Sequence, residues 1–159
     1  MRNVQDWNPN FMDLSPMFGS FEYLKKHVEN MQFWPEHIDL NCMNIQKRQI
    51  ATRSGKQICF VSPVARKQCF EQEYESKIYL TGQVQTRTKS WHDFFNALVW
   101  HIFPRAKAVL NQLHYQARLS ESLNGIKHRS ALRDAATLFD ESGVIVVSSQ
   151  KVLMQLLKD

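Results

Sequence analysis

Residues 90–104 read SWHDFFNALVWHIFP, and they predict a helix around which the rest of the chain is arranged. Ser90 is a suitable N-cap, and Asp93 occupies an early position where an acid stabilises the helix N-terminus. Nearly all the remaining positions of this stretch are apolar, so we expect the helix to be buried on most sides. Pro104 ends it and is well suited to begin a second helix, which we expect to run to about residue 120.

Outward from these helices, the periodicity predicts more helices and a few short strands. The expected helices are 20–30, one ending near Arg48, 91–103, 104–120 and 150–158. The expected strands lie near Ile58, Ile78, Leu138 and Ile145, the last two forming a hairpin around 140–143. The predicted fold class is α+β: one predominantly helical domain over residues 1–159 with a small, mainly antiparallel β-sheet. Within it, we expect 1–19 to form an irregular N-terminal arm and 20–159 the folded core.

Composition excludes several classes of protein. The chain has 159 residues, of which 43% are hydrophobic and 22% charged, with only five Gly and five Pro, so it is not a collagen, a disordered tail or a linker. Cys42, Cys59 and Cys69 form no C-x-x-C pair, so we expect reduced, mostly buried thiols. No apolar run is long enough to cross a membrane, and the N-terminus lacks an export signal. We therefore expect a cytoplasmic protein without a membrane partner.

Basic residues gather in one part of the chain. Between positions 40 and 70 there are six basic residues and no acid, against a net charge of +5 for the whole chain. This segment is either a solvated basic face or a binding surface for nucleic acid or another polyanion, with Trp34 or Phe60 available for stacking. The candidate contacts to phosphates are Lys47, Arg48, Arg53, Lys56, Arg66 and Lys67.

The two central helices carry polar residues at helical spacing. His92 and Asn96 are four positions apart, and Asn111 and His114 belong to a polar line on the next helix that also contains Lys107 and Arg118. That line either faces solvent or lines a pocket with His92 and Asn96. In the second case the sequence predicts a small hydrolase or related acid/base enzyme. Its candidate catalytic residues are His92 and His114 for proton transfer, Asn96 and Asn111 as orienting or oxyanion donors, and Asp134 in support.

Ordinary structural roles remain open for the same residues. His92 is equally suited to capping or core packing, His101 to packing, and Asp134 to an ion pair with Arg129 or Arg133; Asp140 and Glu141 belong to the predicted turn. Although His92, Asp93, His114 and Asp134 are suitable ligands, no spacing is characteristic of a metal site, so we predict neither metal nor cofactor. Phosphate loops, dinucleotide fingerprints and nucleophile elbows are absent from the sequence.

A long, ordered set of residues is similar to a known family. It comprises Trp91 to Trp100, Phe103-Pro104-Arg105, Lys107, Leu110-Asn111, His114, Arg133-Asp134-Ala135, Thr137 to Glu141 and Gly143, with Tyr74-Glu75, Gly82 and Thr86-Arg87 also in the pattern. From about Trp34 onward, the chain resembles a bacterial, mainly proteobacterial, family known as a domain of unknown function. The resemblance implies no particular activity. Because such proteins continue with a further segment containing His, Glu and Gly, we expect this chain to be short at its C-terminus.

A third hypothesis is a non-catalytic interaction module. The predicted last helix, Gln150 to Lys158, would then dock a partner protein or a second copy of the chain, which leaves a homo-oligomer open.

Overall fold

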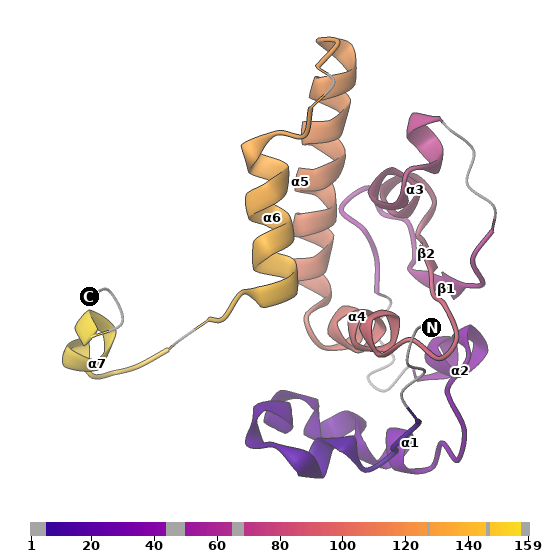
Figure 1. Cartoon of the computed structure of the whole chain (residues 1–159), viewed down its shortest axis with the longest axis vertical. Coiled ribbons are helices and arrows are strands. Elements are labelled where there is room, and N and C mark those ends of the chain that lie inside the picture. The colour runs from indigo at the N-terminus through magenta and orange to yellow at the C-terminus, as the bar shows by residue number, and fades with distance from the viewer. Residues whose placement is uncertain (1–5, 44–49, 65–68, 127, 146, 157–159) are drawn as a thin grey trace.

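A computed structural model of the chain describes residues 6–43, 50–64, 69–126, 128–145 and 147–156 (Figure 1). The α-helices are α1 (Lys25–Glu29), α2 (His37–Cys42), α3 (Tyr74–Thr81), α4 (Trp91–Ile102), α5 (Pro104–Leu123), α6 (Ala131–Ser142) and α7 (Lys151–Leu156). Three 3-10 helices are η1 (Phe11–Leu14), η2 (Pro16–Leu24) and η3 (Phe70–Gln72), and two strands are β1 (Cys59–Val61) and β2 (Gln83–Gln85). The predominantly helical character predicted from the sequence is confirmed.

The sheet differs from the prediction. It has two strands in the described part of the chain, and they run parallel, with Phe60 opposite Val84. They are parallel because α3 lies between them in the chain and carries it back to the same end of the sheet. Ile78, expected in a strand, is a buried residue of this helix. The prediction of a mainly antiparallel sheet is therefore wrong.

The predicted hairpin at 137–147 is also wrong. Leu138 lies in α6, a helix in which Ala136 is buried. Asp140 and Glu141 belong to the last turn of this helix and not to a hairpin turn. After Gly143 the chain has no regular structure in its described residues up to Gln150, and Ile145 is exposed. A strand needs a partner to satisfy its backbone groups, and none of the described segments pairs with this one.

Other boundaries shift by smaller amounts. The first predicted helix begins earlier, as η2 at Pro16, and continues into α1. The second helix ends at Cys42, while the remainder predicted up to Arg48 lies outside the described residues. The three cysteines, expected to be mostly buried, are all exposed.

The core centres on α4. Ser90 caps this helix by accepting a hydrogen bond from the Asp93 backbone N–H at 3.3 Å, as its sequence predicts. Its buried positions pack against the sheet and the N-terminal segment, in which Phe11 and Met12 are buried. Trp7, Trp34 and Trp91 form an aromatic cluster with Phe11, Phe18, Phe94 and Phe95.

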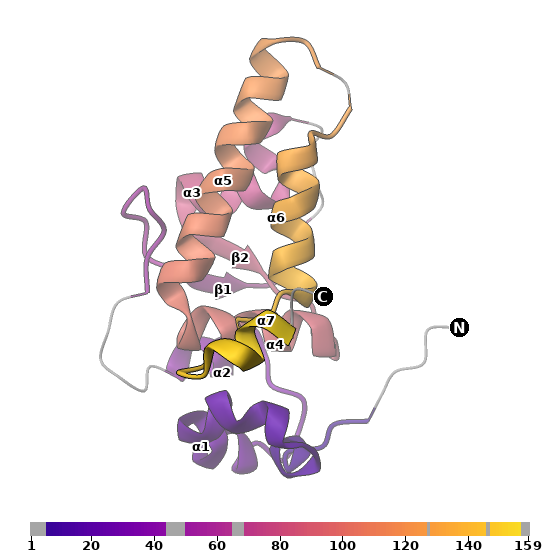
Figure 2. The ribbon, with the colours of Figure 1, turned by 90° about the vertical axis from the view of Figure 1, so that its left-hand side faces the viewer.

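Two long helices stand beside this core. α5 and α6 lie side by side in both views, and α5 also packs against α3 and α4 (Figure 2). Beyond α6, α7 lies apart from the rest of the ribbon with Val152, Leu153 and Leu156 exposed (Figure 1). Among the described helices, none combines the length and the hydropathy that a membrane span requires.

Candidate functional site

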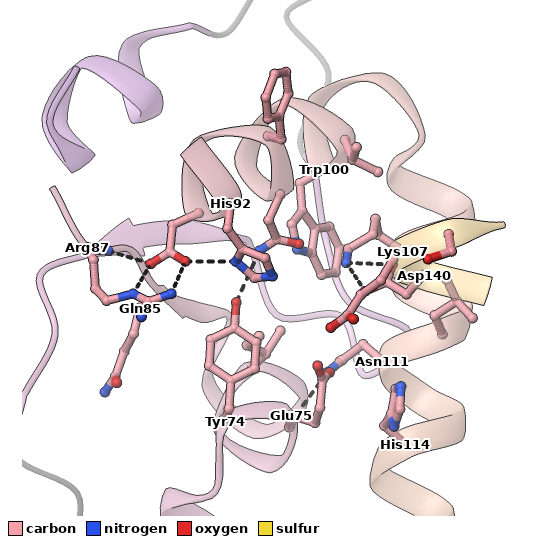
Figure 3. A pocket seen from close by; sticks show the side chains of 18 of the residues that line it. Tyr74, Glu75, Gln85, Arg87, His92, Trp100, Lys107, Asn111, His114 and Asp140 are labelled. Atoms are coloured by element: carbon pink, nitrogen blue, oxygen red, sulfur yellow. Dashed lines mark hydrogen bonds and ion pairs between the residues drawn. The ribbon is translucent and has the colours of Figure 1, made fainter. Parts of the chain in front are cut away.

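A cavity of about 1100 Å³ lies among α3, α4, α5 and the C-terminal end of α6 (Figure 3). Its apolar lining includes Phe18, Phe21, Phe95, Val99, Trp100 and Leu110. Its polar lining includes Tyr74, Glu75, Gln85, Arg87, His92, Asp93, Asn96, Lys107, Asn111, His114, Asp140, Glu141 and Ser142. A concave, mostly apolar pocket with a few convergent polar groups is typical of a small-molecule site.

The corner between α4 and α5 brings the two polar lines together. In one continuous helix, positions 92 to 114 would extend over roughly 33 Å. Instead, Phe103 leaves helical geometry at φ −119° and ψ 52°, and Pro104 starts α5 in a new direction. His92 and His114 consequently line the same cavity.

Arg87, Asp93 and His92 form a chain of hydrogen bonds at the start of α4, and Figure 3 shows the Arg87 and His92 ends of this chain. Arg87 donates to Asp93 from its backbone N at 2.8 Å, its Nε at 2.9 Å and its Nη2 at 2.8 Å. His92 Nδ1 lies 3.0 Å from Asp93 Oδ1. Burial alone would raise the pKa of Asp93, but the hydrogen bonds from Arg87 and His92 lower it to about 2. The ionised carboxylate therefore favours the His92 tautomer with a proton on Nδ1, which leaves Nε2 as a free acceptor.

Tyr74 and Asn96 meet beside His92. Asn96 Nδ2 donates to the Tyr74 hydroxyl at 3.0 Å, and Figure 3 shows Tyr74 rising from α3 toward α4. Burial, with added repulsion from Glu75 and Asp93, raises the pKa of Tyr74 well above its ordinary value. The phenol therefore stays protonated, and its own O–H is available as a donor, as is the second N–H of Asn96.

Asn111 and His114 lie deeper, on α5. Asn111 is only 2% exposed, and its Nδ2 donates to the Glu75 carbonyl at 2.9 Å and to Glu75 Oε2 at 2.7 Å. Neither Asn111 Oδ1 nor His114 Nδ1 has a hydrogen-bond partner among the described residues. Burial lowers the pKa of His114, more than the nearby Glu75 carboxylate can raise it, so a neutral imidazole is favoured at pH 7.

Lys107 ties α6 to the cavity wall. Its Nζ donates to both carboxylate oxygens of Asp140, at 2.8 and 2.7 Å, and lies 5.7 Å from the centroid of the Trp100 ring. The ammonium group is thus held between a carboxylate and an aromatic face.

A family model described as a protein of unknown function (DUF3025) matches residues 58–159. The chain belongs to the DUF3025 family. No curated protein and no solved structure matches it. The DUF3025 segment contains all the polar groups that line the cavity, whereas Met17, Phe18 and Phe21 close it from outside that segment.

Four of the five residues predicted as catalytic line the cavity, namely His92, Asn96, Asn111 and His114. The fifth, Asp134, is not among its lining residues and instead forms an ion pair with Arg129 Nε at 2.8 Å on an exposed face of α6. Asn111 is not free to act as an oxyanion donor, because its Nδ2 already donates to the carbonyl and the carboxylate of Glu75, and its unpartnered atom is the acceptor Oδ1.

The sequence alone does not select Tyr74, Glu75 or Arg87 as site residues, although all three belong to the set of residues on which the family resemblance was based. That pattern was the available signal. Tyr74 contacts Asn96 across 22 positions and Glu75 contacts Asn111 across 36, so no local spacing predicts these two residues. Arg87 lies six positions before Asp93, in the irregular segment between β2 and α4, where no helical spacing applies.

The basic segment is described only in part. Lys47, Arg48, Arg66 and Lys67 lie outside the described residues. Arg53 and Lys56 are exposed on the turn around Gly55. Phe60 is 2% exposed and so is not available for stacking, while Trp34 is partly covered by Trp7 and Trp91. Across the described ranges, no group of three or more His, Cys, Asp or Glu side chains is placed to hold a metal ion.

Proposed function

We propose that this protein is a hydrolase that applies general acid–base catalysis to a small polar molecule in the cavity. The observation that supports this proposal is the hydrogen-bonded chain from Arg87 through Asp93 to His92, which ends at the cavity. Such an arrangement holds an imidazole in one tautomer and orients it for proton transfer.

In this proposal His92 is the general base. Asp93 accepts the Nδ1 proton, so Nε2 takes a proton from a water molecule as that water attacks the substrate. The resulting imidazolium is stabilised by the Asp93 carboxylate and returns the proton to the leaving group. The His92 side chain is 69% exposed, so water reaches it readily.

Tyr74 and Asn96 are proposed to stabilise the negative charge that develops on the substrate oxygen. Each retains one hydrogen that their mutual bond does not use. Donors held in place by the fold stabilise such an oxyanion without reorganisation, and loss of one donor typically lowers kcat by about 10²- to 10³-fold.

The test is the turnover of three substrate classes, a p-nitrophenyl ester, a p-nitrophenyl phosphate and an aminoacyl p-nitroanilide. We expect the wild-type chain to hydrolyse one class and His92→Gln to lower kcat by about 10²- to 10⁴-fold. The melting temperature should stay close to wild type, because the imidazole is mostly exposed. His27→Gln, an exposed histidine in α1, is the matched control. Wild-type rates in His92→Gln would refute the assignment of His92, and no turnover of any class would refute the proposed function.

For location, we propose a bacterial cytoplasmic protein, in keeping with the expectation from the sequence. Fractionation of a native host, followed by immunodetection in the cytoplasmic and envelope fractions, tests this.

A further inference from the structure

We infer that the inner end of the cavity, beside Glu75 and Asn111, binds an organic cation, so that the substrate of the proposed hydrolase carries a guanidinium or ammonium group. Only the identification of this cation as a substrate rests on the proposed function. The binding of the cation stands on its own observations and is measured without turnover.

The first observation is an acceptor without a donor. Asn111 Oδ1 is buried and has no hydrogen-bond partner in the described part of the chain. Its orientation is fixed by Glu75, because rotating the amide by 180° would place Oδ1 against two acceptors, the Glu75 carbonyl and carboxylate. The atom of this amide that lacks a partner, at the wall of the cavity, is therefore an oxygen, and a buried oxygen of this kind is satisfied by an N–H or O–H donor.

The second observation is the charge of the lining. Four carboxylates, on Glu75, Asp93, Asp140 and Glu141, face two cations, on Arg87 and Lys107. Each cation is already paired, Arg87 with Asp93 and Lys107 with Asp140. Glu75 and Glu141 therefore have no basic partner among the described residues. The cavity is acidic inside a chain whose net charge is +5, so its charge selects for a cation.

The third observation is the aromatic lining. Tyr74, Trp100 and Phe95 line the same space, and faces of aromatic rings attract cations. Lys107 already shows this chemistry within the chain, since its ammonium lies near the Trp100 ring and against Asp140.

The geometry favours an extended organic cation over a metal ion. The carboxylates and imidazoles that line the cavity are spread over four helices, and among the described residues no three such side chains lie close enough to hold a metal ion. A guanidinium presents five N–H donors in one plane, which suits it to the separate acceptors of Glu75 and Asn111.

The test compares two probes of the same shape, L-argininamide and L-citrullinamide, by isothermal titration calorimetry with the full chain at low salt. The two probes differ chiefly in the guanidinium, which citrulline replaces with an uncharged urea. We expect argininamide to bind with a Kd at least tenfold lower than that of citrullinamide. Equal affinities, or no binding of argininamide at millimolar concentrations, would overturn the inference.

Two variants locate the site. Glu75→Gln should weaken argininamide binding by tenfold or more, and Glu141→Gln should weaken it by a smaller factor. Because Glu141 is exposed and lacks an ion pair among the described residues, Glu141→Gln is expected to fold even if Glu75→Gln does not. Glu22→Gln, an exposed carboxylate outside the cavity, is the control and should bind normally. Unchanged affinity in Glu75→Gln and Glu141→Gln together would place the cation elsewhere and refute the site.

Binding of argininamide and hydrolysis of a substrate can be distinguished from each other by experiment. His92→Gln should still bind argininamide while losing turnover. If the wild-type chain binds argininamide but hydrolyses nothing, the cation site stands and the hydrolase does not. If it hydrolyses a neutral substrate and does not bind argininamide, the hydrolase stands and the cation site does not.

Discussion

Asp93 shows how one residue serves both the stability of the fold and the chemistry of the site. Its carboxylate accepts three hydrogen bonds from Arg87 and faces His92 Nδ1. We predict that Asp93→Asn lowers the free energy of unfolding by about 2 kcal/mol at pH 7, because charge-assisted hydrogen bonds are lost. Urea denaturation of both proteins measures this difference.

The effect of Asp93→Asn should depend on pH in a defined direction. The pKa of Asp93 is about 2 in the fold, below the value near 3.9 of an unfolded Asp. Its contribution is therefore fully present above about pH 4 and is lost as the pH falls toward 2. The two proteins should converge in stability over that interval, and a difference that is constant down to pH 2 would contradict the assignment.

Two histidines give a second pH dependence, of similar sign. Burial lowers the pKa of His101, although its hydrogen bond to the Leu40 carbonyl acts in the opposite direction. Burial also lowers the pKa of His114; the carboxylates of Glu75 and Asp140 oppose this effect, and the charges of Arg129 and Arg133 add to it. Unfolded histidines take up protons near pH 6.5, so both residues should destabilise the fold as the pH falls below that value. We predict a falling melting temperature between pH 7 and 5, with a shallower slope in the His101→Gln, His114→Gln double variant. An identical slope would count against neutral, buried imidazoles.

At the scale of single elements, α3 depends on the glycine that ends it. Gly82 has φ +77°, and a Cβ built there would lie 2.0 Å from the Gln57 carbonyl oxygen. The chain passes directly from Gly82 into β2, so the parallel pairing of β2 with β1 brings Gly82 close to the backbone of Gln57.

We predict that Gly82→Ala is more destabilising than Gly55→Ala. Both glycines have positive φ, at which alanine costs about 1 to 2 kcal/mol, but nothing lies within 4 Å of a Cβ at Gly55. Only Gly82→Ala adds a backbone clash. Denaturation curves of the two variants measure the difference, and equal losses would show that the contact with Gln57 relaxes freely.

The elements predicted correctly are those with strong local signals. Ser90 and Pro104 mark the start of α4 and the start of α5, and both boundaries agree with the structure. Ile78 lies in a segment with Tyr and Thr residues that favour strands, but packing of α3 against α5 decides for a helix. Leu138 is a second such case, because the short run Thr137-Leu138-Phe139 before the turn residues 140–143 predicts a strand, whereas these residues continue α6.

At the scale of the whole molecule, a buried ion pair between Glu121 and Arg133, outside the cavity lining, joins α5 to α6. Glu121 Oε2 accepts from Arg133 Nη1 at 2.8 Å, and Glu121 Oε1 accepts from the Ser130 backbone N at 2.9 Å. Burial opposes ionisation of Glu121, but these bonds lower its pKa to about 2.

We predict that Glu121→Gln destabilises the protein by about 2 kcal/mol at pH 7. The substitution removes the negative charge that pairs with Arg133 and that accepts a hydrogen bond from the Ser130 backbone N–H before α6. Glu141→Gln, at an exposed acid of α6, is the control and should change stability by no more than about 0.5 kcal/mol. Thermal melting of both variants is the measurement. Equal melting temperatures for the two variants would show that this pair does not hold α6 in place.

The candidate site could be predicted only where it follows helical spacing. His92, Asn96, Asn111 and His114 share lines on two consecutive helices, and they do line one cavity. Their partners come from distant parts of the chain: Tyr74 reaches Asn96 across 22 positions, and Lys107 reaches Asp140 across 33. Those contacts depend on the packing of α3 and α6, which the sequence pattern misassigned.

The corner at Pro104 has a further consequence. Each residue of an α-helix advances the side-chain direction by about 100°. An insertion of one residue between α4 and α5 would therefore leave both helices intact and turn Asn111 and His114 away from His92. The break fixes the rotational phase of one helix against the other, so the length of this short joint, as much as the identity of any polar residue, determines whether the protein has a site at all.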